Sequence, residues 1–166
     1  MGMIDGMIPE FEHEAALTRE VLLRVPEEKW EYKPHEKSMS MRELASHLAE
    51  NPMWAEGTIE QDVMEIDTAT YKSYVAADTT EMMKTFDGYV AAAKKAMAGV
   101  TDEQLLATWK MVDPAGNVML EMPRIAVLRS FVISHTIHHR GQLTVYLRMQ
   151  DVPLPSIYGP SADEQG

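Results

Sequence analysis

Apolar side chains recur every three to four residues in four separate segments of this 166-residue chain. This spacing places the apolar residues of each segment along one face of an α-helix. We expect helices over about residues 9–25, 40–60, 79–99 and 123–150. Four such helices bury their apolar faces most simply against one another, so the expected fold class is an all-α four-helix bundle.

Residues that favour helix termini mark the start of each expected helix. Pro9 suits the first turn of the first helix, where a backbone N–H would have no partner in any case. Ser40 and Glu43 form a capping box, in which each side chain accepts a hydrogen bond from the other residue's backbone N–H. Asp78 and Pro123 mark the starts of the third and fourth helices.

The segments between the helices predict how the bundle is connected. Pro52 lacks a backbone donor and should kink or interrupt the second helix. The polar stretch that follows, to about Asp78, is a connection long enough to carry the chain along the whole bundle. The sequence DPAG at 113–116 lies between two runs of strand-forming residues and predicts a small β-hairpin before the last helix.

The length of the chain suits one domain, spanning residues 1–166, with its core at about 8–150 and an extended tail at 151–166. Asp and Glu number 26 against 15 Lys and Arg, so the formal charge is −11. Such a chain repels a nucleic-acid backbone and an anionic membrane surface, and neither is an expected partner. No cysteine and no long apolar run occur in the sequence, which favours a soluble, cytoplasmic protein.

The stretch SHTIHHRGQL, residues 134–143, contains half of the six histidines. On a helix, His139 lies about 40° around from His135 and about one turn further along, so the two rings can converge. Gln142 and Tyr146 project on the same side as His135, which is the apolar side of this helix. Arg140 projects on the other side, where we interpret it as structural, at a helix pairing or a dimer contact.

Two neutral imidazoles in an apolar interior need partners for their ring nitrogens, and a divalent cation supplies one. Two ligands rarely suffice, so a third is expected from another helix. His47 lies in the middle of the second helix beside apolar residues and is the natural choice, whereas His13 and His35 have charged neighbours that favour a surface position. His138 remains open as an alternative ligand, or as a second-shell or pocket-lining group.

Further pocket candidates lie near His47 on the same helix. Asn51 and Glu50 project within about 60° of His47, and Trp54 within about 20°. Glu50 is a candidate general base, or it orients an imidazole, or it is a solvated surface carboxylate. Gln142 is a second catalytic candidate, which could bond substrate or metal-bound water. Tyr146 is a candidate for the pocket, although its pattern is more typical of a packed core tyrosine.

The sequence HTIHHRGQL at 135–143 resembles the signature of the DinB-like family of small metal-binding four-helix bundles, which is related to the YfiT-type proteins. The segment KPHEKSMSMRELASHLAE at 33–50 is similar to the second-helix region of that family. The resemblance extends over nearly the whole chain. It implies a three-histidine metal site, here His47, His135 and His139, usually within a homodimer. It assigns no reaction, because most members have none.

Three imidazoles without a carboxylate leave a divalent ion charged and with at least one open position. A water there is acidic, with a pKa of about 7 on zinc. We therefore expect a metal-dependent enzyme that acts on a small molecule, as a hydrolase or as a transferase of low-molecular-weight thiols, the latter by analogy with relatives. Zinc or nickel is the expected metal, and iron also suits the ligands. The alternative is a non-enzymatic stress-response bundle that binds metal or a small molecule.

Overall fold

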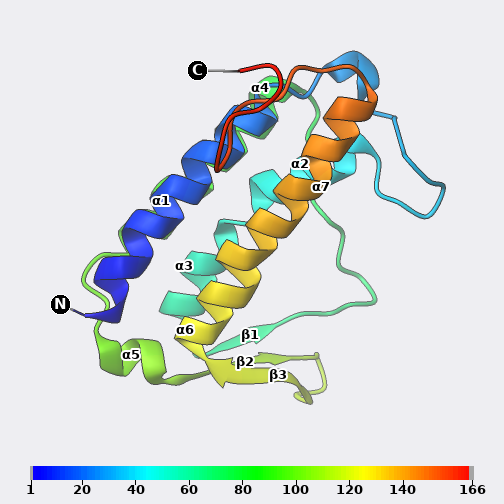
Figure 1. The fold of residues 1–166 in the computed structure, drawn as a ribbon. Coiled ribbons are helices and arrows are strands. Elements are labelled where there is room, and N and C mark those ends of the chain that lie inside the picture. Colours follow the sequence, from blue (N-terminus) through cyan, green and yellow to red (C-terminus); the bar gives the residue numbers. More distant parts are fainter. Residues whose placement is uncertain (1, 165–166) are drawn as a thin grey trace.

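Four helical rods stand side by side in the computed structural model, which describes residues 2–164 (Figure 1). The predicted four-helix bundle is therefore confirmed. The rods are, in chain order, α1 (Met3–Leu22), the pair α2 (Met41–Glu50) and α3 (Met53–Glu60), α4 (Thr79–Met97), and the continuous series α6 (Arg124–Val127), a π-helical segment (Leu128–Ser134) and α7 (His135–Met149).

The first helix begins at Met3, which corrects the expected start near Pro9. Asp5 and Asp102 cap its first turn: the Gly2 amide donates to Asp5 Oδ2 and the Met3 amide to Asp102 Oδ1, each at 2.7 Å. This extra length adds Ile4 and other apolar residues to the core, which consequently begins before residue 8. Pro9 lies inside the helix on an exposed position.

The second rod is interrupted where the sequence predicts. Ser40 and Glu43 form the expected capping box at the start of α2, with the Glu43 amide donating to Ser40 Oγ at 3.1 Å. The helix ends at Glu50, and α3 starts at Met53, immediately after Pro52. The missing proline donor explains the break.

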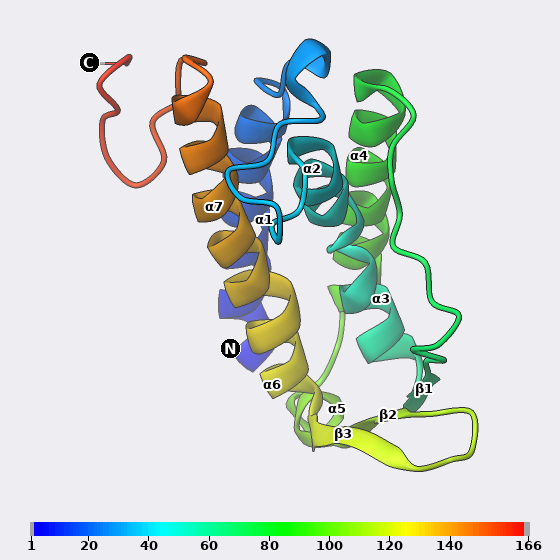
Figure 2. The same cartoon turned by 90° about the vertical axis from the view of Figure 1, so that its right-hand side faces the viewer.

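The rods are not arranged as simple sequential neighbours. The first rod packs against α4 and α7, and the second rod also packs against α4 and α7, so α1 and α2 lie on a diagonal of the bundle. Figure 2 shows the connection between α3 and α4 returning along the whole length of the bundle, so α4 runs in the same direction as α2 and α3. This confirms the predicted long connection.

The predicted hairpin is present, within a small sheet at one end of the bundle (Figure 2). Strands β2 (Thr108–Val112) and β3 (Val118–Pro123) pair antiparallel. Gly116 has a φ of 82° in the turn, and its amide donates to the Asp113 carbonyl at 2.9 Å. A short strand β1 (Val63–Glu65), which was not predicted, pairs parallel with β2. The short helix α5 (Asp102–Leu106) lies directly before β2 in the chain.

The core consists of two apolar clusters, one toward each end of the bundle. On the last rod, the residues of one cluster end at Ile133 and those of the other begin at Leu143. A polar layer lies between the two clusters. The three histidines of one side of this layer are His47, His135 and His139. The layer also contains five buried polar residues, which are Glu14, Thr18, Asn51, Thr136 and Arg140. Within residues 2–164, none of the helices has the length and apolar character that a membrane crossing requires.

Candidate metal centre

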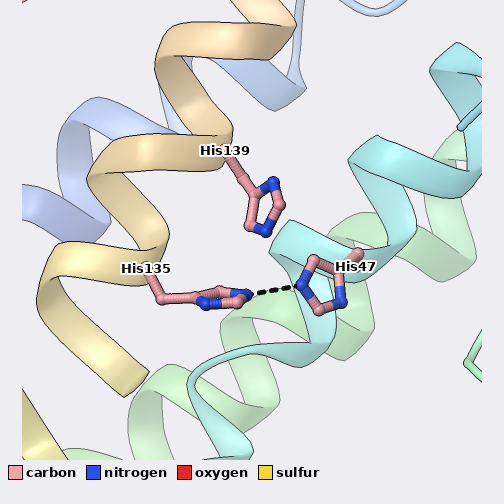
Figure 3. Close-up of side chains that lie close together, drawn as sticks. All are labelled: His47, His135 and His139. Atoms are coloured by element: carbon pink, nitrogen blue, oxygen red, sulfur yellow. Dashed lines mark hydrogen bonds between the residues drawn. The ribbon is translucent and has the colours of Figure 1, made fainter. Parts of the chain in front are cut away.

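Three imidazole rings from two rods meet at one side of the polar layer (Figure 3). His47 comes from α2, whereas His135 and His139 come from successive turns of α7. The Nε2 atoms of His47 and His135 lie 2.7 Å apart, and one nitrogen of each ring lies within 4.8 Å of the others. The spacing of four residues on α7 and the antiparallel packing of α2 bring these nitrogens together.

Burial keeps these rings neutral. All three histidines are half-buried, and desolvation lowers the pKa of His47 and of His139 below the ordinary value. Desolvation, with added repulsion from the neighbouring imidazoles, lowers the pKa of His135 to about 4. A neutral imidazole offers a lone pair to a metal ion, whereas a protonated one does not.

The side chain of Gln142 orients the ring of His139. Its Oε1 lies 2.7 Å from His139 Nδ1, and since an amide oxygen only accepts, Nδ1 carries the proton. The lone pair of His139 is then on Nε2. This contact is typical of a group that fixes the tautomer of a metal-binding histidine. Gln142 itself is exposed.

A π-helical segment lies directly before the histidine pair. Phe131, which lies in this segment, and His135, which follows it, line one cavity. The Asn51 side chain holds this segment against the second rod: its amide nitrogen donates to the Val132 carbonyl at 3.0 Å and to Thr136 Oγ1 at 2.7 Å. Asn51 therefore positions the backbone that carries His135.

An aromatic cavity of about 180 Å³ borders the histidines. We use this name for the space lined by His47, Glu50, Trp54, Tyr71, Phe131 and His135, together with Asn51 and Ile66. The rings of Trp54 and Phe131 stack at an interplanar angle of 27° with their centroids 6.4 Å apart. Burial raises the pKa of Glu50, and the Tyr71 hydroxyl donates to its carboxylate at 3.5 Å.

The remaining candidates from the sequence lie elsewhere. His138 is exposed, and its ring packs beside that of His139 without joining the group of three. His13 and His35 are exposed, as expected. Tyr146 is a core residue and not a pocket residue: it is 9% exposed, and its hydroxyl donates to the Met39 carbonyl at 3.3 Å.

The sequence reasoning missed a second polar cluster, on the opposite side of α7. Arg140 is 2% exposed, and its guanidinium donates to the Glu14 carboxylate and to the Tyr158 hydroxyl, both at 2.6 Å. It also donates to the Glu14 carbonyl and to Thr18 Oγ1. A signal was present, because Glu14 and Thr18 recur at helical spacing on the apolar face of α1. Arg140 thus joins two helices, as one of its predicted roles required.

The donor set fits a divalent transition metal. Imidazole nitrogens suit zinc, nickel, copper and iron, which typically bind them at about 2.0–2.1 Å. Within residues 2–164, the group of potential ligand side chains contains these three histidines and no carboxylate. The group borders the aromatic cavity through His47 and His135.

Comparison with known proteins places this geometry in a family. The model of the DinB family matches residues 3–165. The YrdA protein of Bacillus subtilis, which is uncharacterised, is 46% identical over 44 residues, and the match covers 26% of this chain and 26% of that protein.

Solved structures share the fold over nearly the whole chain. A DinB-like protein of Bacillus cereus superposes with a TM-score of 0.72 at 21% identity, covering 93% of this chain and 97% of that one. YfiT of Bacillus subtilis superposes with a TM-score of 0.65 at 14% identity, covering 90% of this chain and 89% of its own. That protein is described as a probable metal-dependent hydrolase with an unusual four-helix bundle topology.

Proposed function

The chain belongs to the DinB family, and from that premise we propose that it is a metal-dependent hydrolase acting on a small molecule. The observation that carries this proposal is the convergence of His47, His135 and His139 beside a cavity. The description of YfiT as a probable metal-dependent hydrolase supports the same reaction class.

We assign a separate role to each group of residues in the site. His47, His135 and His139 would hold the ion, and Gln142 would keep the Nε2 lone pair of His139 available. A bound divalent ion polarises a carbonyl and acidifies water in such a site. Zinc or nickel is the metal that we propose.

Glu50 is the proposed proton carrier. It lines the cavity that the histidines border, and burial moves its pKa toward neutrality, where a general base is most effective. In the hydrolysis of an amide or ester, its carboxylate takes the proton of the attacking water. The bond between the carbonyl carbon and the leaving nitrogen or oxygen then breaks, and Glu50 returns the proton to that leaving atom.

Metal analysis tests the proposal first. Protein purified without an affinity tag or added metal should contain about one divalent ion per chain. His47→Ala and His139→Ala should lose it while keeping their helical circular dichroism, and His138→Ala, the matched control, should keep most of it. Metal retained in both ligand variants would refute the assignment.

An activity screen tests turnover. Amide and ester substrates, with and without low-molecular-weight thiols, should yield hydrolysis that Glu50→Gln slows by about 10²-fold or more. Turnover that requires a thiol would replace hydrolysis with group transfer. A protein that binds stoichiometric metal but converts none of these substrates, with or without a thiol, would favour the non-enzymatic alternative.

A further inference from the structure

A second cavity meets the aromatic cavity at His47. It has a volume of about 370 Å³, and its polar lining residues are Lys33, Glu36, Lys37, Ser38, Glu43 and Ser73 as well as His47 and Tyr74. We call it the polar cavity. His47 is the residue that lines both spaces, so a molecule lying across this imidazole can reach into each of them.

The two cavities differ in chemistry. Trp54, Phe131 and Tyr71 present rings to the aromatic cavity. Its volume of about 180 Å³ suits one ring, since an apolar cavity of about 150 Å³ is enough to hold benzene. The polar cavity presents ammonium, hydroxyl and carboxylate groups in its place.

Of the two lysines in the polar cavity, Lys37 has more freedom to bind a ligand. Lys33 is engaged by Glu43, with its Nζ 3.5 Å from the carboxylate. Among residues 2–164, no carboxylate forms an ion pair with Lys37. An ammonium group without an acidic partner at the wall of a cavity is suited to a carboxylate of the ligand.

One segment of the chain forms part of both walls. Tyr71 lines the aromatic cavity, whereas Ser73, Tyr74 and Val75 line the polar cavity. The end of this segment is fixed to α2, because the Ala76 amide donates to Ser46 Oγ at 2.9 Å and its carbonyl accepts from Arg42 Nε at 2.7 Å. The same piece of backbone therefore forms part of the wall of both spaces that His47 lines.

We propose that the substrate is a two-part molecule, in which an aromatic or similarly sized apolar acyl group fills the aromatic cavity and a carboxylate-bearing polar group fills the polar cavity. The bond that joins the two parts then lies at His47. An N-aroyl amino acid has this chemistry. This inference rests on the proposed function for the cleavage of that bond, but the two binding sites are made by the protein's own side chains.

Binding of a matched probe series tests the proposal. Hippurate carries both parts, benzamide carries the aromatic part, and N-acetylglycine carries the polar part. Isothermal titration should show hippurate binding at least tenfold more tightly than either half, in metal-loaded protein and in the same order after chelation. Hippurate that binds no more tightly than the better half would overturn the proposal.

Two variants assign the parts to their cavities. Phe131→Ala should weaken hippurate and benzamide about tenfold and leave N-acetylglycine unchanged. Lys37→Gln should weaken hippurate and N-acetylglycine but not benzamide, whereas Lys84→Gln, an exposed lysine on α4, should change none of them. Equal weakening of all three probes by either cavity variant would refute the assignment, and melting temperatures identify a variant that has lost its fold.

Failure of the two proposals can be told apart. If the protein binds metal and hydrolyses a substrate but does not bind hippurate more tightly than its two halves, only the proposal of a two-part substrate is overturned. If the protein binds hippurate more tightly than its two halves but binds no metal, only the proposed function is overturned.

Discussion

His139 and Arg140 are neighbours on α7, yet their side chains belong to two very different polar clusters. Arg140 lies on the closed side of the polar layer, where Glu14, Thr18 and Tyr158 satisfy its guanidinium. His139 lies on the open side, where three half-buried imidazoles converge beside a cavity. The closed side joins α7 to α1 and to the C-terminal tail, and the open side faces α2.

The difference shows that one polar layer can stabilise the fold on one side and offer ligands to a metal ion on the other. Each terminal nitrogen of Arg140 donates two hydrogen bonds within the protein, and a buried ion pair held in this way stabilises one arrangement of helices. Imidazoles whose ring nitrogens converge on one point offer ligands to a cation. Substitutions on the closed side should therefore change stability, and those on the open side should change metal binding.

The largest effect is expected from breaking the closed side. Arg140→Met leaves the Glu14 carboxylate, which is 6% exposed, without its guanidinium partner. Removing one partner of a buried pair typically costs about 3–5 kcal/mol in the free energy of unfolding. Chemical denaturation measures this loss.

A double variant sharpens that result. Glu14→Gln combined with Arg140→Met removes both charges, and it should recover most of the stability lost by Arg140→Met alone, because no buried charge is left unpaired. A double variant as unstable as the single one would show that packing, and not charge, governs the closed side.

A smaller effect is expected on the open side from Gln142→Ala. The variant loses the acceptor for His139 Nδ1, so the ring and its tautomer are no longer fixed. Loss of such a partner typically lowers metal affinity about 10–100-fold. Stability should change by less than about 0.5 kcal/mol, because Gln142 is exposed. Competition with a chromogenic chelator measures the affinity, and an unchanged value would contradict this role.

The stability of the protein should depend on pH through the histidines of the open side. The folded-state pKa of His135 is lowered to about 4, so between pH 6.5 and about 4 the unfolded chain binds the proton that the folded chain excludes. Stability of the metal-free protein should therefore fall as pH drops through this range. After allowance for solvent screening of a half-exposed ring, the loss is about 1–2 kcal/mol. His135→Gln should lose less stability over the same range, and parallel curves would contradict the assignment.

The smallest effect is expected from Tyr158→Phe. The variant removes a hydroxyl that accepts from Arg140 and donates to Glu14 at 2.7 Å, while the ion pair itself remains. A cost of about 1 kcal/mol in unfolding free energy is typical for such hydrogen bonds. Metal content should not change, and a change would show that the two sides of the layer are coupled.

Local patterns in the sequence predicted most of the fold. The Ser40 and Glu43 capping box, the interruption at Pro52 and the turn at Asp113–Gly116 all lie where local chemistry places them. The predicted start of α1 was wrong, because the helix begins at Met3, where Asp5 caps Gly2 and Asp102 caps Met3. The contribution of Asp102 comes from a distant part of the chain and leaves no local pattern to recognise.

The site was predictable in part. A spacing of four residues brings His135 and His139 to one face of a helix, and this is visible in the sequence. Phe131 lies four residues before His135, so helical spacing places it on the same face, and the two side chains line one cavity. Tyr71 comes from a connection without periodicity, so nothing in its neighbourhood indicated that it would contact Glu50.

The sequence by itself determined that four amphipathic helices would form and that two imidazoles would share one face of the last, since both follow from spacing along one rod. Only the tertiary structure decided that α2 packs against this face and α1 against the opposite one. That choice depends on how apolar faces from distant segments bury one another, and it makes His139 part of an open cluster and Arg140 part of a closed one.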